Sequence, residues 1–200
     1  MADAPKTELE MMAQVEAQLH HDEPEMQHIT LTRQIDRIVM IIGDAFSWLW
    51  LVLLVVIIGN VILRYVFSQG MIELEELQWY LYATAWLVGM SYTFAHDGHV
   101  RVDVIHENLR FKTKMWLELF GLLLLFLPFV YFVLVYSLPF VQLSWETGET
   151  STSANGLGAR WLVKGTLTLS FFLLFLVGLS RLTRVIFTLK NGPAGPAGAQ

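Results

Sequence analysis

The sequence predicts an all-α polytopic membrane protein with four transmembrane helices, and two observations support this fold class. Four long apolar runs are separated by short polar connections, and a helix needs roughly 20 apolar residues to cross a bilayer. Hydrophobic residues make up 54% of the chain and charged residues only 16%, whereas a soluble domain carries about 25% charged residues. Little of the chain is left for a soluble domain, and nothing indicates a nucleic-acid-binding surface.

The two ends of the chain differ from its middle in composition. Residues 1–30 carry seven acidic residues against a single base, Lys6. The spacing of Thr7 and Glu10 fits a helix capping box, but the charge of the segment favours a disordered acidic tail. Residues 191–200 are rich in Gly, Pro and Ala, which predicts a second disordered tail.

The middle of the chain, residues 31–190, is predicted to form the transmembrane domain. The second apolar run is the most sharply bounded, with 19 residues free of charge. The third contains Pro128 and Pro139, and a proline inside a helix predicts a kink or an early unwinding. The four spans are predicted over about residues 39–63, 77–95, 119–143 and 161–187.

The positive charges predict the orientation of these spans. An even number of spans places both termini on one side, and that side collects ten of the 13 Lys and Arg residues. By the positive-inside rule, both termini and the connection between spans two and three are cytoplasmic. The connections at about 64–76 and 144–160 then face outward.

The first span carries a charged residue near its inner end that has two interpretations. Asp44 lies one to two helical turns from Arg37. A carboxylate inside hydrocarbon often marks an ion path. The charge-free stretch begins only at Ala45, however, which favours an interfacial carboxylate beside the headgroups.

At the other end of the first span, Asn60 and Arg64 lie four residues apart on one helix face. Arg64 either pairs with an acid of the following connection or extends to the lipid headgroups. The candidate acids include Glu75 and Glu76, which open the second span. The helix macrodipole accounts for one acid in the first turn of a helix, so the second acid of the doublet is available for a contact with a partner.

Small residues recur every four positions along the second span, at Ala85, Gly89 and Thr93. Such a stripe allows another helix backbone to approach closely. The pattern therefore predicts helix docking, and it leaves open whether the docked helix belongs to this chain or to another protein.

Two histidines, His96 and His99, follow the second span. A haem bound in a helix bundle takes ligands from facing helices, and no other span contains a histidine. We therefore predict polar caps at a helix end, with no metal and no cofactor. In the same cytoplasmic loop, Asp103 can pair with Arg101 or with Arg110.

No span carries a charge at its centre or the broken, glycine-rich centre of a transporter binding site. Motifs for phosphate loops and nucleophile elbows are also missing. The pattern predicts a non-catalytic membrane scaffold. Two alternatives remain: a haem or quinone anchor of a respiratory complex, motivated by the histidine pair, and a self-sufficient small transporter that uses Asp44.

Three short motifs carry a family resemblance. They are Glu75-Glu76-Leu77-Gln78-Trp79, Trp86-Leu87-Val88-Gly89 and His96-Asp97-Gly98-His99-Val100-Arg101-Val102-Asp103. Together they resemble the small membrane subunit of tripartite ATP-independent periplasmic (TRAP) transporters, the DctQ-like family. The acidic tail over residues 1–30 lies outside that family's pattern.

The resemblance implies a small permease subunit of a sodium-coupled importer (a symporter) of organic acids, in a bacterial inner membrane. The implied partners are a large multi-span transport subunit, a periplasmic solute-binding protein and membrane lipids, with no nucleic acid. A docking face on spans one and two follows from this interpretation. Its expected residues are Glu75, Glu76, Trp79, Ala85, Trp86, Gly89 and Thr93.

Overall fold

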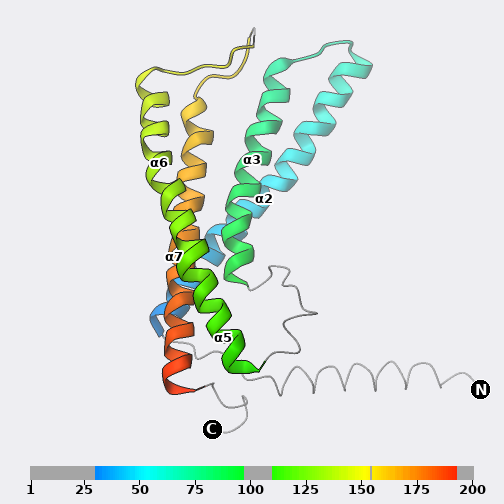
Figure 1. Ribbon diagram of the computed structural model, residues 1–200. Coiled ribbons are helices and arrows are strands. Elements are labelled where there is room, and N and C mark those ends of the chain that lie inside the picture. Colours follow the sequence, from blue (N-terminus) through cyan, green and yellow to red (C-terminus); the bar gives the residue numbers. More distant parts are fainter. Residues whose placement is uncertain (1–29, 97–109, 154, 193–200) are drawn as a thin grey trace, which may run out of the picture.

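The computed structural model describes residues 30–96, 110–153 and 155–192 (Figure 1). These residues form helices and connections with no strand among them, which confirms the all-helical prediction. The predicted tails lie almost entirely outside the described residues. The elements are α2 (Thr30–Val66), α3 (Ile72–Ala95), α5 (Phe111–Phe120), the π-helical segment η1 (Gly121–Phe126), α6 (Leu127–Glu146) and α7 (Arg160–Asn191).

Three helical stretches are long and apolar enough to cross a membrane: α2, the continuous stretch Phe111–Glu146, and α7. The helix α3 has 24 residues and does not belong to this set. Its sequence contains Gln78 and several indole and hydroxyl side chains, which lower its hydropathy. The helix itself is present, and its role as a fourth span remains a prediction.

The helix α7 forms the centre of the bundle, because it contacts α2, α3, α5, η1 and α6. Its small and apolar residues supply most of the buried core. Around it lie two apolar clusters, one of Val39, Leu173 and Val177 and the other of Val130, Phe171 and Leu174. A chain with this packing depends on α7 more than on any other helix for its stability.

The third predicted span is interrupted just before Pro128, where the π-helical segment η1 ends. Proline lacks the N–H group of a regular helix, and its ring crowds the preceding turn, so a locally widened turn relieves the conflict. Pro139, by contrast, lies inside α6 with the helix continuing through it. The segment also brings Phe126 against α7, where Gly178 leaves room: a Cβ there would lie only 2.7 Å from Phe126 Cε1.

The two ends of the bundle differ. At the end that carries the connection 147–159, called the loop end, α2 and α3 lean away from α6 and α7 (Figure 1). At the opposite end, called the arginine end, Arg181 and Arg184 are buried.

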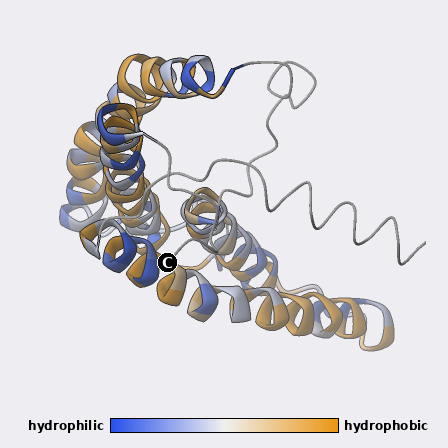
Figure 2. Ribbon diagram, turned by 90° about the horizontal axis from the view of Figure 1, so that it is seen from below, coloured by the Kyte–Doolittle hydropathy of each residue, from blue (hydrophilic) through white to orange (hydrophobic). Residues whose placement is uncertain are grey.

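Apolar residues make up long parts of every helix (orange in Figure 2), and many of their side chains are exposed. Leu125 is 74% exposed and Val55 is 62% exposed. Exposed apolar area on this scale is rare on soluble monomers, and it suits helices whose outer faces contact lipid.

Candidate functional site

A network of buried charges holds the arginine end together. The guanidinium of Arg184 on α7 lies 3.3 Å from the carboxylate of Asp36 on α2, and the hydroxyl of Ser180 donates to Asp36 at 2.9 Å. One turn earlier on α7, Arg181 pairs with Glu118 of α5. Three helices are thereby joined by ion pairs whose arginines are 4–5% exposed.

Sequence reasoning missed this network, because it assigned the arginines only to a cytoplasmic surface. The spacing Arg181–Arg184 does place both arginines on one helix face. Their partners, however, lie 63 and 148 positions away in the chain. A signal was present in Asp36, an acid that precedes the first apolar run on the same face as Val39, but no local pattern identifies its partner.

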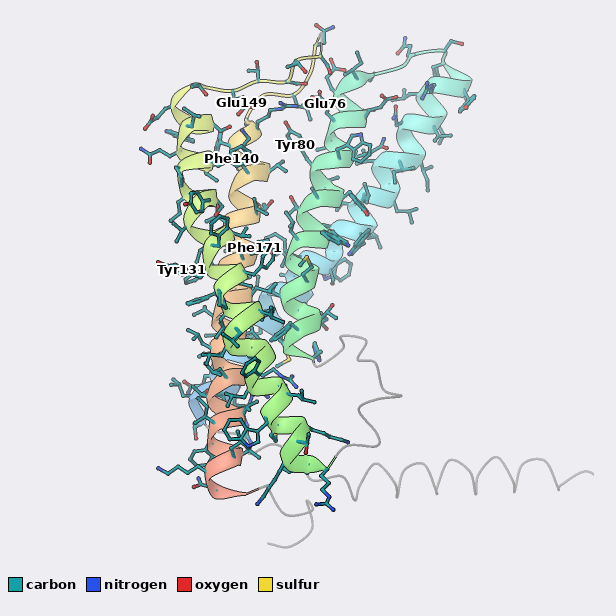
Figure 3. The ribbon with its side chains drawn as sticks, in the orientation of Figure 1. Glu76, Tyr80, Tyr131, Phe140, Glu149 and Phe171 are labelled. Carbon is teal, nitrogen blue, oxygen red and sulfur yellow. The ribbon has the colours of Figure 1, made fainter. Side chains whose placement is uncertain are left out.

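At the loop end, Glu76 ties the connection 147–159 to α3 (Figure 3). The hydroxyl of Ser151 donates to its carboxylate, and the backbone N–H of Leu157 donates to it at 2.6 Å. The hydrogen bond from Ser151 is the main cause that lowers the pKa of Glu76 below its ordinary value of 4.5, against the raising effect of burial. Glu76, one of the two acids of the predicted doublet, thus has hydrogen-bond partners within its own chain.

A second carboxylate, Glu149, closes the same connection onto α6 and α7. It pairs with Lys164, whose ammonium also lies 4.0 Å from the centre of the Phe140 ring. The hydroxyl of Ser144 donates to Glu149 at 2.8 Å, and Arg160 lies 3.5 Å away. Lys164, followed by Ser144, lowers the pKa of Glu149.

These two lowered pKa values predict how the connection responds to acid. A carboxylate with a lower pKa in the folded chain contributes stability above its unfolded pKa, and that stability is lost as the pH falls through the folded value. We expect the connection to stay closed at pH 7 and to open below about pH 4.5. Hydrogen exchange at the N–H groups of Ser151 and Leu157, corrected for the intrinsic rate, measures this opening.

The matched control for the acid response is Glu75→Gln, since Glu75 lies beside Glu76 but pairs elsewhere. Glu76→Gln should open the connection already at pH 7, whereas Glu75→Gln should leave its exchange unchanged. Equal protection of Leu157 in wild type and Glu76→Gln at pH 7 would contradict the assignment.

Between α2 and α3 a groove runs along the helices, and we call it the α2–α3 groove. Its part nearer the arginine end is a cleft of about 400 Å³ that includes Gly43, Ser47, Ala85, Gly89 and Thr93. Its part nearer the loop end is a cleft of about 600 Å³ that includes Ile57, Asn60, Arg64, Gln78 and Tyr82. Trp50 and Tyr82, whose ring centres are 5.9 Å apart, meet between the two parts.

The predicted docking residues of α3 are distributed around this groove. Ala85 is buried, while Trp79 and Trp86 are exposed. A Cβ built on Gly89 would have nothing within 4 Å. The hydroxyl of Thr93 donates to the carbonyl of Gly89 at 2.9 Å. Among the residues that the structure describes, therefore, no helix makes a close approach at Gly89.

The three predicted ion-pair candidates have different surroundings. Arg64 lies 3.3 Å from Glu75, with both side chains largely exposed. Asp44 is exposed and interacts with the hydroxyl of Tyr92. Arg37 is exposed on the first turns of α2, and the structure brings no described acid to it within salt-bridge distance.

Of the predicted cytoplasmic motif, only His96 can be located. It follows α3 and its ring lies 4.4 Å from that of Tyr92. His99, Arg101 and Asp103 lie outside the described residues. Within residues 30–96, 110–153 and 155–192, no three His, Cys, Asp or Glu side chains are grouped closely enough to hold a metal ion.

Apolar outer faces, charges gathered at the two ends and a groove between two helices define an integral membrane protein. The family model for the DctQ component of tripartite ATP-independent periplasmic transporters matches residues 53–188, and the chain belongs to that family. This confirms the resemblance seen in the three sequence motifs. A comparison with curated protein sequences gave no match.

Proposed function

We propose that this chain is the small permease subunit of a sodium-coupled importer of organic acids in a bacterial inner membrane, and that it scaffolds the large transport subunit. The observation that carries the proposal is the family match over residues 53–188. Family members are the small membrane component of a tripartite system, so a large membrane subunit and a solute-binding protein are the expected partners.

The α2–α3 groove is the proposed contact with the large subunit. It combines small residues with the exposed indoles of Trp79 and Trp86. Large aromatic side chains and close backbone approach are both features of helix packing in membranes. In this proposal α3 crosses the membrane as the fourth span, since it packs along α2 and α7.

The orientation of the chain in the membrane is part of the same proposal. With four spans, the arginine end faces the cytoplasm, in agreement with the excess of Lys and Arg on that side. The connection 147–159 then faces the periplasm, where the solute-binding protein delivers its substrate. Glu76 and Glu149 hold this connection in one conformation, so it offers a defined surface.

A pull-down of the tagged chain from its native membrane in mild detergent, followed by mass spectrometry, tests the function. We expect a large multi-span membrane protein to be recovered with it, together with a solute-binding protein. Recovery of a flavoprotein or an iron–sulfur subunit would contradict the proposal in favour of a respiratory anchor. A chain that is recovered alone and transports in liposomes would contradict it in favour of an ion path at Asp44.

A further inference from the structure

In the apolar part of α2, the side-chain oxygen of Asn60 has no hydrogen-bond donor among the residues that the structure describes. Asn60 is only 8% exposed. It lines the loop-end part of the α2–α3 groove. Because an unsatisfied polar group is costly in hydrocarbon, a partner outside this chain would relieve the cost.

A complementary group faces the same cleft from α3. The Nε2 atom of Gln78 is buried and, among the residues that the structure describes, has no acceptor. Both atoms are covered by neighbouring atoms in the lone chain, so the lining of the cleft contains one unsatisfied acceptor, on Asn60, and one unsatisfied donor, on Gln78. Each amide has to turn toward the cleft to bind a partner. A carboxamide or a hydroxyl can satisfy both, because each is a donor and an acceptor at once.

The length of the groove indicates what kind of partner carries the carboxamide or hydroxyl group. Its two parts follow one stripe of α2 from Gly43 to Arg64. At 1.5 Å per residue this stripe is about 30 Å long, which is the thickness of the hydrocarbon core of a bilayer. A phospholipid headgroup would occupy only the end near Arg64, whereas a transmembrane helix fits the whole groove.

We propose that the loop-end part of the α2–α3 groove is a polar socket for one transmembrane helix of the large subunit. That helix carries an Asn, Gln, Ser or Thr side chain that hydrogen-bonds to Asn60 and Gln78. Gly89, where a built Cβ meets no atom of the described residues within 4 Å, receives the same helix by close packing. This inference rests on the proposed function and adds to it the chemistry of the contact.

The double variant Asn60→Leu/Gln78→Leu tests the socket by two measurements. The amount of large subunit recovered with the chain should fall about tenfold, as expected for losing interhelical hydrogen bonds. The thermal stability of the lone chain in detergent should not fall, because the replaced groups are unsatisfied there. The matched control is Gln142→Leu, which removes an exposed amide that bonds Glu146 at 2.8 Å and should leave recovery unchanged.

Three outcomes would overturn the socket, and they are distinguishable. Unchanged recovery with the double variant would refute the socket while the proposed function stands. Parallel losses of recovery and of lone-chain stability would show that the two amides serve only the fold. A wild-type chain that recovers no large subunit would refute the proposed function, and the socket with it.

A photoreactive residue in place of Tyr82 identifies the occupant directly. We expect it to crosslink to a transmembrane peptide of the large subunit that contains Asn, Gln, Ser or Thr. The same residue in place of Tyr131, which is 59% exposed on α6, is the control and should not yield that peptide. A phospholipid adduct at Tyr82, or a peptide with only apolar side chains, would overturn the proposal.

Discussion

Replacing Asp36 by leucine is expected to lower the free energy of unfolding of this chain by about 3–5 kcal/mol, the usual cost of leaving a buried charge without its partner. Asp36 is 7% exposed and Arg184 is 5% exposed, so water cannot readily replace the lost carboxylate. The hydroxyl of Ser180 also loses the nearer of its two acceptors and keeps only the carbonyl of Thr32, at 3.4 Å. Unfolding in a titration of SDS against mild detergent, followed by circular dichroism, measures the change.

The double variant Asp36→Leu/Arg184→Leu should recover much of this loss, because apolar side chains replace both charges of a buried pair at little net cost. The exposed pair Arg64–Glu75 supplies the control, and Glu75→Leu should cost less than about 1 kcal/mol. If Asp36→Leu and Glu75→Leu destabilise the chain equally, the buried network does not hold the arginine end.

Replacing Gly89 by leucine is expected to abolish transport by the assembled system while the chain still inserts and folds. The site has nothing within 4 Å of a built Cβ, so the lone chain accommodates a larger residue. A partner helix in the groove would meet the new side chain, at a cost of about 1–3 kcal/mol of overpacking. Recovery of the large subunit and substrate uptake in proteoliposomes are the two measurements.

The contrast to Gly89 is Gly178, which lies inside the chain's own core. A Cβ there would lie 2.7 Å from Phe126 and 3.1 Å from Leu127, so Gly178→Leu should destabilise the lone chain itself. Normal assembly and transport with Gly89→Leu would place the subunit contact elsewhere on the molecule.

The sequence was sufficient to predict an all-helical membrane protein, because long apolar runs favour helices long enough to cross a bilayer. The positions of the charged edges also pointed to Arg64 and the acids of the next connection as neighbours. The ends of the helices were harder to predict. The helix α2 already includes Thr30, well before the apolar run, and Thr32 and Asp36 in this early part contact α7. Hydropathy alone contains no information about such contacts.

Neither the buried arginines nor the π-helical segment could be predicted. An arginine near a helix end has the same local sequence whether it faces headgroups or a buried acid. Which of the two it faces depends on how α7 packs between α2 and α5. The segment η1 arises from a conflict between Pro128 and the packing of Phe126 against Gly178. In the groove, the burial of Asn60 likewise depends on where α3 lies, which is a property of the tertiary structure.

The position of Arg181 and Arg184 on α7 has a consequence for biosynthesis. Ribosomes synthesise the helices in chain order, and domains generally fold from the N-terminal side first, so α7 is made after α2, α3, α5 and α6. Asp36 and Glu118 therefore lack their arginine partners until α7 has been made. Chains interrupted before this helix carry two acids without these arginines and lack the helix against which the others pack, so we expect them to be unstable.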